Sequence, residues 1–250
     1  MRKPGKTYFA SDFHLGVDGQ LSSREREQKI VRWLDFIKAD ADAIYLVGDV
    51  FDFWYEYRKV VPRGHVRLLA KLAEYTDSGI PVHIFTGNHD MWMFGYLEEE
   101  IGVKLYKSPI EKQIGNKMFF LGHGDGLGPG DHGYKFIKKV FANRINQWLF
   151  AVIHPNLGIK LMQLSSKKSR ESEMEAPEFL GPDKEWLIQF CEKKIKDSDI
   201  DYFIFGHRHL PIEHTLSNGR SIYINTGDWI KHFSFARFDG HALELLKFDK

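Results

Sequence analysis

Residues able to bind metal ions recur in five short motifs, each beside a glycine or a sharp turn. Their side chains offer imidazole nitrogen, carboxylate oxygen and amide oxygen, a donor set that suits a first-row divalent ion. A structural zinc site built from thiolates is disfavoured, because the chain has a single cysteine. The motifs are Asp12-Phe13-His14, Gly48-Asp49, Gly87-Asn88-His89-Asp90, Gly122-His123-Gly124-Asp125 and Gly206-His207-Arg208-His209.

Each motif alone has an ordinary explanation. An aspartate after a strand is more often a turn former or a helix cap than a ligand, and a lone histidine is more often a surface or core residue. The conjunction changes this balance, because four short apolar strands all end in potential ligands. If the chain is extended there, Asp12 and His14 point to the same side, as do His207 and His209. The sequence therefore predicts one dinuclear metal site.

The elements that hold the first three motifs alternate between strand and helix. Apolar runs predict strands at Thr7–Ala10, Ala43–Val47 and Pro81–Thr86, each ending at a motif. A capping box at Ser22 opens one helix, with Ile30, Trp33, Leu34 and Ile37 at helical spacing. A second helix is predicted over His65–Ser78, with Val66, Leu69, Leu72 and Ala73 on one side. This order indicates an α/β fold that binds ligands at the carboxyl ends of its strands.

The second half of the chain reads as a β-rich meander. A hairpin is predicted around Gly115-Asn116, and a strand at Tyr202–Phe205 precedes Gly206. Four further strands follow, at Ile212–Leu216, Ser221–Asn225, Ser234–Phe238 and Leu243–Phe248. Residues from about 131 to 175 form two helical stretches interrupted at His154-Pro155. We interpret these residues as a helical cap inserted into one domain that spans residues 1–250.

The order and spacing of the five motifs resemble the calcineurin-like metallophosphoesterases. The resemblance extends from Asp12 to His209 and so covers most of the chain. It implies a four-layer α/β/β/α sandwich, here with the helical cap as an insertion. It also implies hydrolysis of a phosphoester or pyrophosphate with two divalent metal ions, for which Mn²⁺ is the first expectation and Zn²⁺ or Fe²⁺ are alternatives.

The same resemblance assigns a role to each motif residue. His89 would approach the phosphate, stabilise charge or protonate the leaving group, and Asp90 would orient its ring. Asp125 would support a ligand histidine from behind. The remaining seven would be metal ligands: Asp12, His14 and His209 on one ion, Asn88, His123 and His207 on the other, and Asp49 bridging both.

The size, motif order and insertion resemble, more narrowly, the UDP-2,3-diacylglucosamine pyrophosphohydrolases of lipid A biosynthesis. That resemblance implies a nucleotide-sugar lipid substrate, cleaved to UMP and 2,3-diacylglucosamine 1-phosphate at the inner-membrane surface. An amphiphilic substrate needs an apolar slot for acyl chains and cations for phosphates. The insertion supplies both kinds of residue, including a basic run at Lys167–Arg170. Its candidate substrate contacts are Lys135, Lys139, Phe141, Arg144 and Trp148.

Other interpretations stay open. The apolar residues of the insertion could simply pack it onto the sandwich, since any helical cap needs an apolar face. The lipid A enzymes usually carry Arg where this chain has His89, so another nucleotide or phosphodiester substrate is an alternative. A non-catalytic scaffold of the same fold is less favoured, because every expected ligand position is filled.

Composition limits the class of partner and the cellular compartment that we expect. The 250 residues carry a net charge of +1 and no basic stripe, so we expect no nucleic-acid partner. Cys191 lies in a helix-like apolar pattern and is predicted to be a core residue, and a single cysteine fits a reducing cytosol. No signal peptide and no apolar run of about 20 residues is found. We expect a cytoplasmic protein, peripheral on the inner face of the inner membrane; the oligomeric state is left open.

Overall fold

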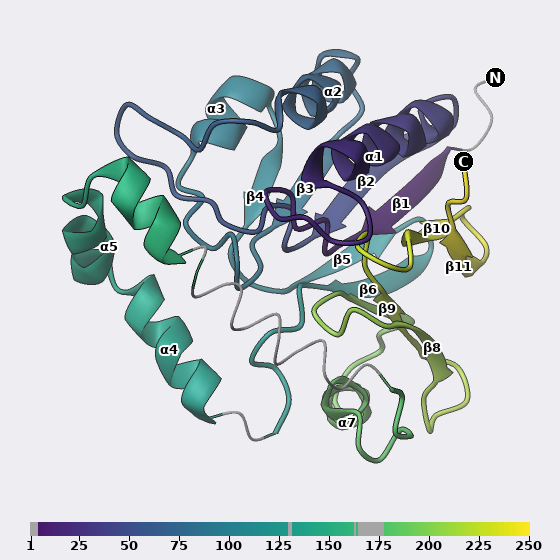
Figure 1. Cartoon of the computed structure of the whole chain (residues 1–250). Coiled ribbons are helices and arrows are strands. Elements are labelled where there is room, and N and C mark those ends of the chain that lie inside the picture. The colour runs from purple at the N-terminus through teal and green to yellow at the C-terminus, as the bar shows by residue number, and fades with distance from the viewer. Residues whose placement is uncertain (1–4, 130–131, 163, 165–177) are drawn as a thin grey trace.

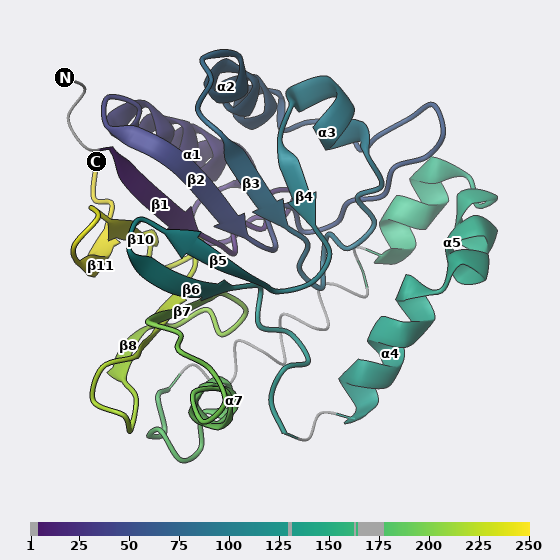
Figure 2. The same cartoon turned by 180° about the vertical axis from the view of Figure 1, so that it is seen from behind.

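The computed structural model describes residues 5–129, 132–162, 164 and 178–250. Two mixed β-sheets stack face to face (Figures 1 and 2). The six-stranded sheet has the order β11 (Leu243–Lys247), β10 (Ser234–Phe238), β1 (Lys6–Ala10), β2 (Ala41–Val47), β3 (Val82–Phe85) and β4 (Lys104–Tyr106). The five-stranded sheet has the order β5 (Ile110–Ile114), β6 (Lys117–Leu121), β7 (Tyr202–Phe205), β9 (Ile222–Thr226) and β8 (Pro211–Thr215).

Helices cover the outer faces of both sheets, which confirms the predicted four-layer α/β/β/α sandwich (Figure 1). α1 (Ser23–Ile37), α2 (Val66–Asp77) and α3 (Tyr96–Ile101) lie over the six-stranded sheet, and α7 (Trp186–Lys194) lies over the other. Between the sheets the ring of Phe9 on β1 stacks on Phe119 of β6, with centroids 5.6 Å apart. The apolar layer between the sheets therefore holds the two halves of the chain together.

The helix signals in the sequence are largely confirmed. Ser22 and Glu25 form the predicted capping box at the start of α1, and the four predicted apolar residues of α1 are buried. Cys191 is a buried residue of α7, as expected. The predicted apolar side of α2 is only partly confirmed: Leu72 is buried, Leu69 and Ala73 are partly buried, and Val66 is 67% exposed. Leu68 and Tyr75 complete the buried side of the helix. Val66 is the first helical residue and follows His65, whose backbone is left-handed.

The predicted C-terminal meander is divided between the sheets. β8 and β9 pair in the five-stranded sheet, whereas β10 pairs antiparallel with β1, aligning Tyr8 with Arg237. An alternation of apolar and polar residues locates a strand but says nothing about its partner. The chain crosses from one sheet to the other between β9 and β10, and so ties the C-terminus to the first strand.

The insertion lies along one side of the sandwich, on the side toward which β2 and β3 run (Figure 2). It contains α4 (His132–Ala142), α5 (Arg144–Ala151) and a helical stretch at residues 155–162. The structure has a break that the sequence analysis missed, at Asn143, whose side chain accepts hydrogen bonds from the amides of Ile145 and Asn146. The basic run Lys167–Arg170 and the end of the predicted insertion lie outside the described residues.

Apolar packing and hydrogen bonds attach the insertion to the loops after β2 and β3. The indole nitrogen of Trp92 donates to the carbonyl of Phe141 at 2.9 Å, and the hydroxyl of Tyr55 donates to the carbonyl of Gln147 at 2.7 Å. The ring of Phe150 packs against Trp92 with centroids 4.7 Å apart. The insertion therefore has a small apolar core of its own against the main fold.

The two faces of α2 give a direct stability test. Leu72→Ala removes a fully buried side chain and is expected to lower the free energy of unfolding by about 2–5 kcal/mol. Val66→Ala, at an exposed position in the same helix, is the matched control and is expected to change it by less than about 0.5 kcal/mol. Urea unfolding followed by circular dichroism measures both values, and similar losses in the two variants would contradict this packing of α2.

Candidate metal centre

All five motifs lie at the carboxyl ends of strands. β1, β2 and β3 run parallel in one sheet, and β6 and β7 run parallel in the other. Parallel strands end at the same edge of a sheet, so the loops after these five strands gather at one end of the sandwich. The fold thereby brings together residues that are almost 200 positions apart in the chain, such as Asp12 and His209.

The backbone at these loops is strained. Asp12, His14, Asp49, His207 and His209 all have positive φ, between 43° and 69°. Residues with a Cβ rarely adopt this conformation, and such strain concentrates at functional sites. The prediction that these segments are extended is therefore wrong, yet their side chains still converge. Hydrogen bonds from the amides of Asp12 and His14 to the carbonyls of Gly48 and Asp49 hold the strained loops together.

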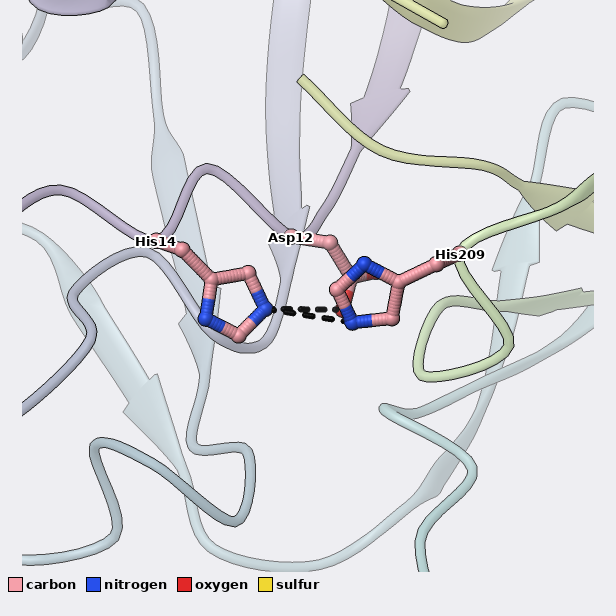
Figure 3. A group of neighbouring side chains, drawn as sticks. All are labelled: Asp12, His14 and His209. Carbon is pink, nitrogen blue, oxygen red and sulfur yellow. Dashed lines mark hydrogen bonds and ion pairs between the residues drawn. The ribbon is translucent and has the colours of Figure 1, made fainter. Parts of the chain in front are cut away.

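One ligand group consists of Asp12, His14 and His209 (Figure 3). Nε2 of His14 lies 3.6 Å from Oδ1 of Asp12, and Nε2 of His209 lies 3.4 Å from the same oxygen. The two Nε2 atoms are 3.2 Å apart. Three donor atoms on loops from both sheets thus surround one small volume.

The second group lies beside the first and is joined to it by Asp49. Oδ1 of Asn88 lies 3.0 Å from Nε2 of His123 and 3.1 Å from Nδ1 of His207. Oδ2 of Asp49 lies 3.3 Å from Nε2 of His123 and 3.6 Å from Nε2 of His14. This single oxygen therefore faces both groups, as a bridging ligand must.

The two buried carboxylates have the same arrangement. In each, one oxygen is fixed by the backbone: Oδ2 of Asp12 accepts from the amide of His207 at 3.0 Å, and Oδ1 of Asp49 accepts from the amide of His89 at 2.9 Å. The other oxygen is buried and accepts no hydrogen bond from any described residue. A buried carboxylate oxygen without a donor is costly. Cations between these oxygens and the imidazoles would satisfy them, so the residues fit divalent metal ions.

Two further carboxylates support the ligand histidines and were missed by the sequence analysis. Oδ1 of Asp52 lies 3.5 Å from Nδ1 of His14, and Oδ2 of Asp228 lies 3.3 Å from Nδ1 of His209. Such contacts set the tautomer and direct Nε2 toward the site. The signal for Asp228 was present, because Gly227-Asp228 repeats the dipeptide Gly48-Asp49 after another strand. Asp52 was hidden among the aromatic residues that follow Asp49.

The contacts of His89 and Asp90 differ from the expected ones. Nδ1 of His89 faces Asp52, whose carbonyl lies at 3.2 Å and whose carboxylate lies at 3.7 Å. Asp90 instead accepts hydrogen bonds from the amides of Gly87 and Phe51, at 2.7 and 3.3 Å. Asp90 therefore stabilises the loop after β3. Asp52 lies beside the ring of His89, in the position that was predicted for Asp90.

Asp125 connects the site to the insertion. It was expected to support a ligand histidine, and its charge contributes to the raised pKa of His123. Its carboxylate also forms an ion pair of 2.5 Å with Lys138 of α4. Asp125 is buried and Lys138 is partly exposed. Since His123 lies only two residues earlier, this pair fixes α4 next to the loop that carries a ligand.

The candidate substrate contacts of the insertion have different surroundings. Nζ of Lys135 donates to the carbonyl of Gly128 at 2.7 Å, and Phe141 packs on Trp92 with centroids 5.3 Å apart. Lys139, Arg144 and Trp148 are exposed. Phe141 therefore takes part in packing the insertion, whereas Trp148, 66% exposed, presents its ring to the surface.

Burial and pairing shift the pKa values of the site strongly. Burial alone would raise the pKa of Asp12, but His209 and His14 lower it to about 2. Burial alone would lower the pKa of His14, but Asp12, Asp52 and Asp49 raise it to about 10. In the same way, the pKa of Asp49 is lowered and the pKa of His123 is raised. Burial and the charge of Asp49 raise the pKa of Asp90 to about 7. His14 and His123 therefore take up protons where a metal ion would otherwise sit.

Comparison with known proteins places this site in a family context. The family model of calcineurin-like phosphoesterases matches residues 5–211. A UDP-2,3-diacylglucosamine hydrolase of Porphyromonas gingivalis is 37% identical, with 96% of each chain covered. One of Serratia proteamaculans is 26% identical, covering 97% of this chain and 98% of the relative. The solved structure of the phosphoesterase Yfce from E. coli shares 15% identity at a TM-score of 0.49, covering 98% of this chain and 93% of that one.

Replacing the bridging carboxylate should disturb both ligand groups. Asp49→Ala removes the oxygen that faces His14 and His123, so bound metal is expected to fall from about two ions per chain to one or none. Asp201→Ala is the matched control, because Asp201 binds Lys117 at the opposite end of β7. Elemental analysis after gel filtration measures the stoichiometry. Unchanged metal content in Asp49→Ala would refute the bridging role.

Metal binding should release protons. Because the pKa of His14 is raised to about 10, its ring is protonated at pH 7, and a metal ion must displace that proton. The apparent metal affinity is therefore expected to rise from pH 6 to pH 9, by about tenfold per pH unit for each proton displaced. Isothermal titration calorimetry in two buffers of different ionisation enthalpy counts the protons. Binding without proton release, at an affinity independent of pH, would contradict this account.

Proposed function

This chain belongs to the calcineurin-like phosphoesterase family, and from that premise we propose that it hydrolyses the pyrophosphate bond of UDP-2,3-diacylglucosamine. The products would be UMP and 2,3-diacylglucosamine 1-phosphate, formed with two divalent metal ions bound, Mn²⁺ being the first choice. The observation that carries the proposal is the position of Asp49, whose Oδ2 faces both ligand groups. The names of the two curated relatives support this choice of substrate.

The contacts in the metal centre suggest a role for each residue in the proposed hydrolysis. The bound ions would supply positive charge that polarises the attacked phosphate and lowers the pKa of the attacking water. The backbone amides of His89 and His207 hold the carboxylates of Asp49 and Asp12 in place. The ring of His89, with its centroid 4.8 Å from that of His14, would stabilise charge on the phosphate or protonate the leaving oxygen. Asp52 would fix that ring by its contact with Nδ1.

The insertion supplies the apolar surface that an acylated substrate requires. Monomeric soluble proteins rarely expose large groups of apolar side chains without a function. We assign this surface to the acyl chains and to the inner-membrane face on which the protein would sit peripherally, on its cytoplasmic side. None of the described helices has the length and apolar character needed to span a bilayer. The exposed residues are Phe136, Ile145, Trp148, Leu149, Val152, Leu157, Leu161 and Leu164.

The test of the proposed function is release of UMP from UDP-2,3-diacylglucosamine in the presence of Mn²⁺, with UDP-glucose as the substrate without acyl chains. We expect release from the acylated substrate and little from UDP-glucose. Trp148→Ala should lower kcat/KM for the acylated substrate by about tenfold, because it removes one large exposed apolar side chain.

The control for that variant is Phe36→Ala, which truncates an exposed aromatic side chain on α1, away from the insertion. It should leave the same kcat/KM within about twofold. Absence of UMP release while a chromogenic phosphodiester is still hydrolysed would overturn the lipid substrate. It would direct the search to soluble nucleotides and other phosphodiesters.

A further inference from the structure

A pocket of about 480 Å³ adjoins the metal centre on the side of β3. It is lined by Thr86 and Gly87 from the site loop, by Met91 and Phe94 from the segment that follows, and by residues of α4 and α5. Gly87 directly precedes Asn88, whose Oδ1 faces His123 and His207. A group in this pocket would therefore lie next to a group held at the metal centre.

The pocket is positively charged. Lys107, Lys138 and Arg144 line it, and the lining includes no Asp or Glu among the residues that the structure describes. Lys138 is neutralised by Asp125. The exposed side chains of Lys107 and Arg144, by contrast, form no ion pair within the described part of the chain, and Nζ of Lys107 lies 5.4 Å from the ring centroid of Phe94. Two uncompensated cations beside a phosphate site favour a second anionic group.

We propose that this pocket binds the second phosphate of a diphosphate ester, the one that is not attacked, and that Lys107 and Arg144 determine the preference for diphosphate over monophosphate esters. The proposal rests on the proposed function, in that the metal centre holds the attacked phosphate. Lys107 comes from the segment after β4 and Arg144 from the first turn of α5, so the pocket exists only because the insertion docks on the main fold.

The chemistry of diphosphate hydrolysis explains the need for such a pocket. The oxygen of water forms a bond to the attacked phosphorus, and the bond from that phosphorus to the bridging oxygen breaks. The bridging oxygen leaves with the electron pair on the second phosphate, and the proton lost by the water is released to solvent. Negative charge therefore grows on the leaving phosphate, where the planar guanidinium of Arg144 and the ammonium of Lys107 would stabilise it.

Binding of two nucleotides tests the proposal without turnover. The ligands are UMP and the α,β-methylene analogue of UDP, which carries a second phosphate and cannot be hydrolysed. Isothermal titration calorimetry on the Mn²⁺-loaded protein gives the ratio of their dissociation constants. The wild type should bind the analogue more tightly than UMP, and Arg144→Ala and Lys107→Ala should each reduce that preference by about tenfold.

Lys160→Ala is the matched control, because Lys160 is an exposed lysine of the insertion that does not line the pocket. Circular dichroism checks that all three variants are folded. A preference lost in Arg144→Ala or Lys107→Ala but kept in Lys160→Ala supports the pocket. A preference kept in both pocket variants, or lost equally in the control, overturns it. If UDP-2,3-diacylglucosamine is not cleaved while the preference still depends on Arg144, the lipid substrate fails and the pocket stands.

Discussion

Two carboxylates buried at the meeting point of the two sheets impose the constraint on which this structure depends. Asp12 and Asp49 are almost wholly buried, and each has one oxygen with no hydrogen-bond donor among the described residues. Burying such charges costs several kcal/mol per ion unless opposite charge surrounds them. The rings of His14 and His123, whose pKa values are raised, provide that charge as imidazolium in the protein alone, and metal ions would provide it in the loaded protein. Proton and metal binding are therefore two solutions to one electrostatic problem.

Steric demands around these carboxylates explain why glycines accompany the ligands. A Cβ at Gly206 would collide with Oδ2 of Asp12 and the side chain of Ser11. A Cβ at Gly87 would collide with Oδ1 of Asp49. These glycines allow the loop of one strand to approach the carboxylate of another, which is how ligands from both sheets reach one small volume. A glycine beside a ligand residue in the sequence thus indicates that the backbone there approaches another side chain closely.

The four layers were implied by the family resemblance of the motifs, and α3 and β4 were not predicted. Local patterns in the sequence were enough to predict most of the other strands and helices and the site loops. They were enough because strand ends, caps and glycine-flanked ligands depend on neighbouring residues. The division of the last strands between the sheets was not predictable, since pairing of β10 with β1 joins residues more than 220 positions apart. The same limit hid Asp52 and Asp228, whose importance comes from which histidine each one faces. Asp90, assigned to the ring of His89, turned out to hold backbone amides, which no spacing rule could distinguish.

Residues outside the two ligand groups support the ligand loops on both sides of the site. On one side Lys138 of α4 pairs with Asp125, two residues after His123. On the other, Arg208, between the two ligand histidines of its loop, is held by the buried carboxylate of Glu185 at 2.9 and 3.1 Å. Glu185 directly precedes α7, and the ring of the next residue, Trp186, contacts His207 at a centroid distance of 5.6 Å. Rigid elements that grip the ligand loops from behind let those loops keep positive φ angles that would relax in an unsupported turn. The layers of the sandwich therefore do more than bury apolar surface, because they hold the strained geometry on which metal binding would depend.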